Sequence, residues 1–263
     1  MLNKLLKYDL KYMLKNMSVF YILAVFFAII TRILFSLEQT VIMQIIDQIT
    51  LGCMYSMIAS ILINTLMRSW VRFRDSIYKD EAYLTHTLPV TKNDIYNSKF
   101  IQALIFFIVG FVIIVISLLI TYYTKDRWIM IKDYIGSITT GLNFKPGYFI
   151  AGMLAIIFLE VFNAIQCGFL GMILGHKKNN NKIAFSILFG FIAYLVAQSL
   201  VLLLTYISGF FNSGIMDLFK NEIMLDTSAF KLLVILAIVL YTIIIFLMSI
   251  LCKKEFQKGV NIE

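Results

Sequence analysis

The sequence predicts an all-α membrane protein with six transmembrane helices, an N-terminal amphipathic helix at the membrane interface, and both termini in the cytoplasm. Three observations predict this fold class: six long apolar stretches, few charged residues, and an uneven distribution of lysine and arginine. Of the 263 residues, 60% are hydrophobic and only 14% are charged, whereas about 25% of the residues of a soluble domain are charged. This composition excludes a soluble globular domain.

Each of the six apolar stretches is long enough to cross a bilayer. A helix needs about 20 apolar residues to cross about 30 Å of hydrocarbon, because lipid offers no hydrogen-bond partner to an unpaired backbone group. The stretches cover residues 19–37, 41–67, 101–123, 148–174, 183–207 and 232–252. We therefore treat residues 1–263 as a single transmembrane domain.

Lysine and arginine gather in alternate connections. Segments 1–17, 68–99, 176–182 and 253–263 carry 16 of them, whereas segments 124–147 and 209–231 carry 6. The positive-inside rule places the first group in the cytoplasm. The net charge of +8 lies in short clusters beside the apolar stretches and forms no face that could follow a phosphate backbone, so nucleic acid is not an expected partner.

The segment before the first span has the pattern of an amphipathic helix. Its basic stripe consists of Lys4, Lys7, Lys11 and Lys15, and leucine and methionine cover much of the other side. Such a helix can lie in the headgroup layer with membrane lipid as its partner. Asp9 breaks the pattern because it points to the apolar side. Two interpretations stay open: a simple interfacial anchor, or a helix whose Asp9 meets a cytoplasmic partner or another loop.

The longest cytoplasmic connection, 68–99, contains the motif Glu81-Ala82-Tyr83-Leu84-Thr85-His86-Thr87-Leu88-Pro89-Val90-Thr91, followed by Ile95, Ser98 and Lys99. Pro89 disfavours helix at Leu88, and Thr91 can cap a new helix that runs into the third span. The pattern predicts two short helices around a proline turn.

This motif and the order of the spans resemble the permeases of type-2 ATP-binding-cassette exporters over the whole chain. The resemblance implies that this loop carries a coupling helix that docks on a separate ATPase. The implied contacts are Glu81, Leu84, Thr87, Leu88 and Pro89. A proline turn that merely connects two spans is the alternative interpretation.

The resemblance also implies an ATP-driven exporter of the bacterial plasma membrane, with a hydrophobic or amphipathic cargo such as a peptide, an antibiotic or a lipid. The chain has no Gly-x-x-x-x-Gly-Lys-Ser/Thr loop for nucleotide phosphates, so we expect no ATPase activity in it. As the membrane subunit of such a transporter, the chain is expected to be no enzyme and to bind no cofactor. ATP and Mg²⁺ would belong to the partner ATPase. Six spans also imply a second permease subunit, either identical or similar. We expect no catalytic residues and no metal site.

Polar side chains inside the spans are candidates for a substrate path. Glu160 lies in the middle of the fourth span, where a charge costs about 2.5–3.5 kcal/mol on insertion scales. Asn163 and Gln166 follow at spacings of three on a similar side, and Asn64 and Gln198 are further candidates. Glu160 could contact a cationic or amphipathic substrate, or it could hydrogen-bond across a helix interface.

Small residues in the fourth span and an apolar outer segment complete the prediction. Gly168, Gly171 and Gly175 have spacings that allow close approach of another helix, and we expect them to serve packing. Segment 209–229 is too apolar for a solvated loop and too short to span, so it predicts a re-entrant or interfacial helical pair.

Two other functions remain as alternatives. An ion-coupled secondary carrier would use Asp47 or Glu160 to bind protons, but the two halves of the chain show no convincing self-similarity of the kind such carriers often have. An intramembrane hydrolase would use Glu160 as its acid or base. It would also need a second group of matched chemistry, and the spans offer neither a Ser/His pair nor a His/Glu cluster.

Overall fold

The computed structural model describes residues 2–38, 40–220 and 227–259, and within them it is all-helical, without strands. The helices are α1 (Leu2–Phe35), α2 (Val41–Ile77), α3 (Ala82–Thr87), α4 (Lys92–Tyr122), α5 (Lys125–Gly141), α6 (Pro146–Gly175), α7 (Lys182–Gly209), α8 (Ser213–Phe219) and α9 (Thr227–Gln257). The predicted all-α fold class is therefore confirmed.

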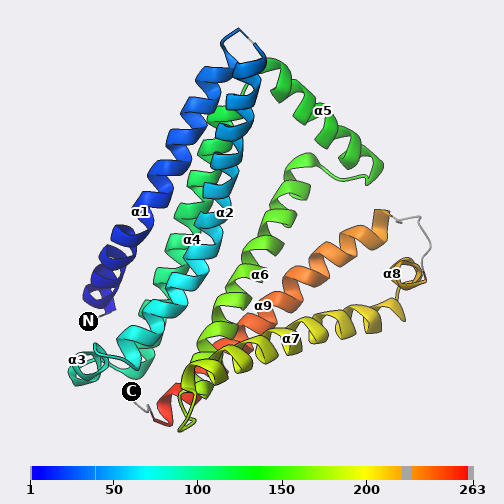
Figure 1. Ribbon diagram of the computed structural model, residues 1–263. Helices are drawn as coiled ribbons and strands as arrows, with labels where there is room; N and C mark the ends of the chain where they lie inside the picture. The colour runs from blue at the N-terminus through cyan, green and yellow to red at the C-terminus, as the bar shows by residue number, and fades with distance from the viewer. Residues whose placement is uncertain (1, 39, 221–226, 260–263) are drawn as a thin grey trace. The chain divides into compact units, whose positions relative to one another are not determined.

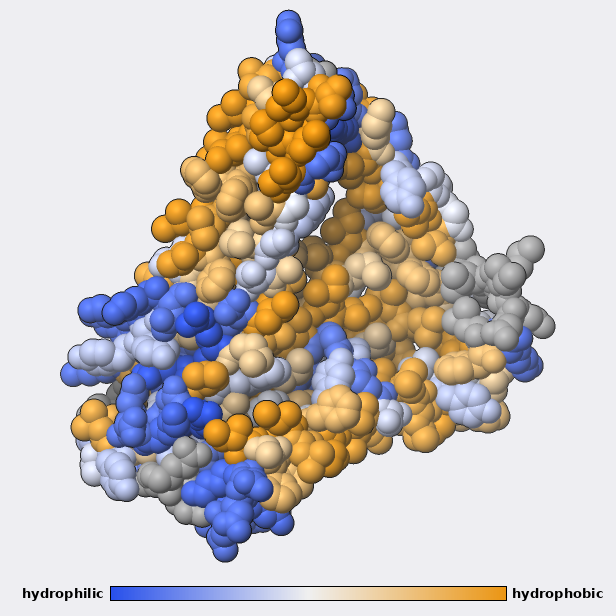
Figure 2. Space-filling view, in the orientation of Figure 1, coloured by the Kyte–Doolittle hydropathy of each residue, from blue (hydrophilic) through white to orange (hydrophobic). Residues whose placement is uncertain are grey.

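Six of these helices are long and apolar enough to cross a membrane: α1, α2, α4, α6, α7 and α9. Each coincides with one of the six predicted stretches, except that the first stretch extends two residues past the end of α1 and the third extends one residue past the end of α4. They are 28 to 37 residues long, which exceeds the roughly 20 residues that the hydrocarbon requires. Figure 2 shows apolar side chains over much of the long helices and hydrophilic ones gathered around α3 and the N-terminal end of α1.

The helices form two compact units. Unit 1 comprises residues 1–76 and 80–129, and unit 2 comprises residues 77–79 and 130–263. Unit 1 therefore contains α1, α3, α4 and all of α2 except its last residue. Unit 2 contains α6 to α9 together with the last residue of α2 and the two residues after it, and α5 is divided between the units. The two units are described separately below.

In unit 1, α1, α2 and α4 run side by side (Figure 1). Their shared apolar core includes Met13, Met17, Tyr21 and Ala24 from α1, Ile61 from α2, and Phe106 and Ile114 from α4. Gly110 allows α4 to approach α2 closely, because a Cβ atom at this position would lie 3.0 Å from Cγ2 of Ile61. This core holds α1, α2 and α4 together, and the same three helices carry the ionic cluster described below.

The N-terminal segment differs from the separate interfacial helix that its sequence suggested. Residues 2–17 form the first turns of α1 and continue without a break into the first span. Met13 and Met17 are fully buried in the core of unit 1. The apolar side of this segment is therefore covered at these positions by protein instead of acyl chains, while the lysine stripe is exposed.

In unit 2, α6 packs against both α7 and α9, and the three helices converge toward the C-terminal end of α6 (Figure 1). The contact between α6 and α7 is made by backbone. A Cβ atom on Gly171 would lie 2.4 Å from the backbone nitrogen of Gly190, and one on Gly175 would lie 2.4 Å from that of Ser186. The predicted packing role of these two glycines is confirmed.

The connections contain both expected and unexpected structure. Thr91 caps α4 as predicted: its hydroxyl accepts from the backbone N–H of Asp94 at 3.2 Å and donates to Oδ2 of that residue at 2.8 Å. The helix α5 was not predicted from its mixed sequence. Of the helical pair expected in 209–229, the structure contains α8, and the second part falls on residues 221–226, outside the described residues.

Candidate functional sites

The helix α3 presents an apolar surface. Its buried side consists of Ala82 and Thr85, whereas Tyr83 and Leu84 are 67% and 71% exposed. The five positions that the resemblance selected, Glu81, Leu84, Thr87, Leu88 and Pro89, are all exposed in this helix or in the residues beside it. A six-residue helix with exposed tyrosine and leucine offers a surface on which another molecule can dock.

A buried ionic cluster lies in the same unit, centred on Asp9. Nζ of Lys99 donates to Oδ1 of Asp9 at 2.6 Å, and Nε of Arg72 donates to the same atom at 3.0 Å. The hydroxyl of Ser98 donates to Oδ2 at 3.1 Å. Asp9, Arg72 and Lys99 are all buried. One carboxylate thus joins α1, α2 and α4.

Arg72 links this cluster to the residue that precedes α3. Its Nη1 donates to both carboxylate oxygens of Glu81, at 2.8 and 2.7 Å. The Arg72 guanidinium also lies over the ring of Tyr12, 4.4 Å from the centroid. Two cations and two carboxylates balance in charge, and such pairing is what makes the burial of ions tolerable. The Glu81 side chain is 48% exposed, so it is the outermost member.

The sequence feature that pointed to this cluster was Asp9, a charged residue on the apolar side of an amphipathic helix. Of the two interpretations left open, contact with another part of the same chain is the one seen. Its partners come from α2 and α4, 63 and 90 residues away in sequence. The pattern of residues 2–16 contained no information on them.

A second polar cluster lies in unit 2, where α6, α7 and α9 meet. The hydroxyl of Tyr194 and Nε2 of Gln198 each donate to Oε1 of Glu160 at 2.6 Å. The hydroxyl of Tyr241 donates to Oε1 of Gln198 at 3.0 Å. Oε2 of Glu160 is buried and has no hydrogen-bond partner among the described residues.

The other substrate-path candidates do not converge on Glu160. Asn163 is fully buried, and its Oδ1 accepts from Sγ of Cys167 at 3.6 Å. Gln166 reaches α9, where its Nε2 donates to the hydroxyl of Ser249 at 2.5 Å. Asn64 belongs to unit 1 and donates to the carbonyl oxygen of Ser60 on its own helix at 2.9 Å. Of the five candidates, the structure brings only Glu160 and Gln198 into direct contact.

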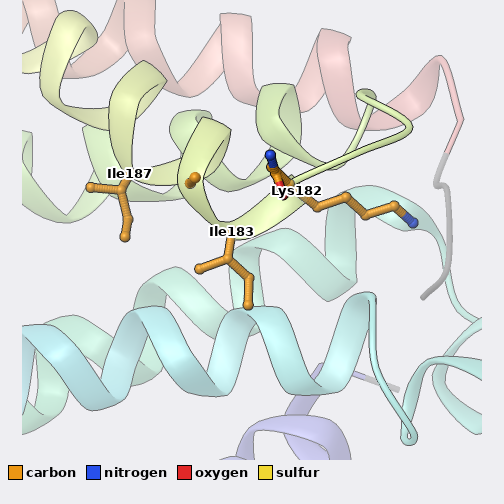
Figure 3. A pocket seen from close by; sticks show the side chains of 5 residues that line it. Lys182, Ile183 and Ile187 are labelled. Carbon is orange, nitrogen blue, oxygen red and sulfur yellow. The ribbon is translucent and has the colours of Figure 1, made fainter.

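Neither a metal site nor a catalytic arrangement stands out in the described part of the chain. Among the described residues, no group of three or more His, Cys, Asp or Glu side chains could hold a metal ion. A pocket of about 520 Å³ lies at the start of α7 and is lined by Asn181, Lys182, Ile183, Ala184 and Ile187 (Figure 3). Its lining is mainly aliphatic and contains no pair of groups suited to acid–base chemistry.

The described fold defines a helical protein with six helices long and apolar enough to cross a membrane, as expected of a multi-pass membrane protein. Comparison of the chain with models of protein families, with curated proteins and with solved structures finds no match. Its function is therefore inferred from its own residues and their arrangement.

Proposed function

We propose that this chain is the permease subunit of an ATP-driven exporter in the plasma membrane of a bacterium. A separate ATP-binding-cassette ATPase would bind ATP and Mg²⁺ and perform the hydrolysis, so this chain is not itself the enzyme. A second permease subunit, identical or similar, would complete the path. The cargo would be hydrophobic or amphipathic: a peptide, an antibiotic or a lipid.

The observation that carries this proposal is the helix α3 together with its anchor. The positive-inside rule puts α3 in the cytoplasm, on the side where an ATPase would act. There it exposes Tyr83, Leu84 and Leu88, which suit docking on a partner protein. The exposed apolar side chains of α3 favour a protein partner, and the sequence resemblance of the loop favours an ATP-binding-cassette ATPase as that partner.

The ionic cluster supports a role in force transmission. A displacement of α3 acts on Glu81, and Glu81 is bound to Arg72. Arg72 in turn shares Asp9 with Lys99. Because these groups come from α2, α1 and α4, a movement at the docking surface reaches three spans of unit 1 through charge-assisted hydrogen bonds.

The Glu160 cluster favours an amphipathic cargo. A carboxylate at membrane depth is expensive and faces protein or a water-filled path in most cases. Two tyrosines and a glutamine around it form a surface that is partly aromatic and partly hydrogen-bonding. Among the three cargo classes, an amphipathic peptide with a basic group matches these side chains best.

The same carboxylate supports a second candidate, the ion-coupled carrier. Oε1 of Glu160 is hydrogen-bonded and Oε2 has no partner within the described residues, so a proton could bind there. A carrier of this kind would move cargo into inverted vesicles with a proton gradient and without ATP. Glu160→Gln would abolish that movement, whereas ATP-dependent uptake would favour the exporter.

The first experiment is co-purification of the tagged chain from its native cells in mild detergent, with ATP hydrolysis measured on the purified complex. We expect a soluble ATPase to accompany the native chain and to be weakened at least tenfold by the double substitution Glu81→Ala, Leu88→Ala. The matched control is Leu37→Ala, Glu38→Ala, which removes an exposed leucine and glutamate from the connection between α1 and α2.

The control should retain the ATPase at the native level. If no ATPase accompanies the native chain under several gentle conditions, the exporter proposal loses its main support and the carrier becomes the leading candidate. Equal retention by both double variants would refute the docking role of α3.

A further inference from the structure

The segment between α2 and α3 has an anchor of its own in unit 2. Tyr78 is fully buried, and its ring stacks on the imidazole of His176, with the ring centroids 4.0 Å apart and the planes at 21°. His176 follows directly on the last residue of α6 and is buried as well. Tyr78 lies three residues before Glu81, so it is the buried aromatic side chain nearest to α3 on that side of the chain.

His176 is itself fixed within unit 2. Its Nδ1 donates to the carbonyl oxygen of Met172 at 2.9 Å and lies 3.3 Å from the hydroxyl of Ser186 on α7. Ser186 is also the residue against which Gly175 packs. The ring of Tyr78 therefore rests on an imidazole that is held by both α6 and α7.

The hydroxyl of Tyr78 stays neutral in this environment, because burial raises its pKa above the ordinary value. The ring of Tyr78 is therefore uncharged near neutral pH, and changes of pH in that range do not break the contact through Tyr78.

We infer that Tyr78 is a positioning residue that transmits displacement of α3 to the helices of unit 2 through its stack on His176. This inference rests on the proposed function, since it takes the partner ATPase as the source of the displacement. Glu81 passes the displacement of α3 to α1, α2 and α4, whereas Tyr78 passes it to α6 and α7. Glu160 lies sixteen residues before His176 on α6, about 24 Å along the helix at 1.5 Å per residue, so the movement of α6 also reaches the Glu160 cluster.

Hydrogen–deuterium exchange of the permease–ATPase complex tests this inference without knowledge of the cargo. Exchange is measured without nucleotide and with ATP plus vanadate, in peptides covering residues 82–99 and 172–186. The native complex should respond to nucleotide in both regions. Tyr78→Leu, which keeps apolar volume but removes the ring, should keep the response in 82–99 and lose at least half of it in 172–186.

Two further variants define the control. Tyr78→Phe keeps the ring and should respond like the native complex, which separates the stack from the hydroxyl. Tyr134→Ala removes an exposed tyrosine from α5 and should change neither region. Melting temperatures of all variants establish that they are folded before exchange is compared.

The outcomes separate the inference from the function on which it rests. A full nucleotide response of residues 172–186 in folded Tyr78→Leu overturns the role of Tyr78 and leaves the exporter intact. If residues 82–99 of the native chain show no response, or no ATPase is bound, the exporter proposal fails and the transmission role falls with it. Loss confined to 172–186, with Tyr78→Phe unaffected, supports the inference.

Discussion

At the scale of single residues, the cost of unpaired charge decides which side chains this chain can bury. Asp9 lies inside unit 1 because Arg72 and Lys99 meet it there. Glu160 is half-buried in unit 2 and accepts hydrogen bonds from neutral groups. The first site pairs two cations with the carboxylates of Asp9 and Glu81, whereas the second holds one carboxyl group among neutral donors. Substitution should therefore affect the two sites differently.

Asp9→Ala should lower the free energy of unfolding by about 3–5 kcal/mol, because it leaves Lys99 and Arg72 buried with one carboxylate fewer. Thermal denaturation in detergent, followed by intrinsic fluorescence, measures the loss. The control Asp133→Ala removes an exposed aspartate from α5 and should stay within about 0.5 kcal/mol of the native chain. Equal melting temperatures for the two variants would mean that the Asp9 cluster contributes nothing to stability.

Glu160→Gln should change stability by less than about 1 kcal/mol, because its amide oxygen still accepts from Tyr194 and Gln198. Glu160→Ala removes the acceptor and leaves the donors of Tyr194 and Gln198 without it, which should lower the free energy of unfolding by about 1–3 kcal/mol. The same denaturation assay compares the two. Equal losses in the two variants would show that the charge, which both remove, and not the acceptor holds α6 against α7.

At the scale of elements, the distance between α6 and α7 is set by the absence of side chains. Gly171→Ala would place a Cβ atom against backbone of α7, which cannot move aside as a flexible side chain can. We expect a loss of about 1–3 kcal/mol, as is typical of overpacking. Gly136→Ala on α5 meets no atom within 4 Å and should raise stability by about 0.5–1 kcal/mol, since alanine favours helix.

The two glycine variants are compared by their melting temperatures in the same detergent. Shifts of opposite sign are expected, and a neutral Gly171→Ala would mean that α6 and α7 separate easily. Gly175→Ala should behave like Gly171→Ala, because its Cβ atom would meet the backbone of Ser186.

The elements differ in how far the sequence predicts them. The spans are predictable because about 20 consecutive apolar residues have few other uses, and the cap at Thr91 is predictable because it depends on residues three positions apart. α5 was missed because its sequence mixes charged and apolar residues without a clear period. The partners of Asp9 and the stack of Tyr78 on His176 depend on contacts over 63 to 98 positions of sequence, which local patterns do not encode.

In the candidate sites, too, local sequence patterns predict some features, whereas contacts between residues distant in sequence are not predicted. The loop motif predicts a docking role for Glu81, Leu84 and Leu88. The structure shows these residues exposed, and the role itself stays a prediction. The grouping of Glu160, Asn163 and Gln166 relied on helical spacing, and spacing does not say which neighbouring helix each side chain meets. Gln166 turns to α9, whereas Glu160 turns to α7.

At the scale of the whole molecule, the distribution of lysine and arginine predicts the orientation of the chain. Tyr83 and Tyr134 are both well exposed, and the positive-inside rule puts the first in the cytoplasm and the second outside. In intact cells, a membrane-impermeant maleimide should label Tyr134→Cys and leave Tyr83→Cys unlabelled until the membrane is opened. The reverse pattern would invert the topology and remove α3 from the reach of a cytoplasmic ATPase.

The purified chain alone should hydrolyse no ATP, since it carries no phosphate-binding loop. Phosphate release is measured on the chain and on its complex with the partner. Hydrolysis by the isolated chain that disappears when this chain is mutated would contradict the proposal that only the partner subunit hydrolyses ATP.

The glycine contact between α6 and α7 limits the number of parts that can move independently. Neither helix can turn about its own axis at Gly171 without driving a neighbouring side chain or carbonyl into the other backbone. Six spans therefore do not supply six separate degrees of freedom. Reporter groups placed on the two helices near this contact should relax with one common rate constant after a nucleotide jump.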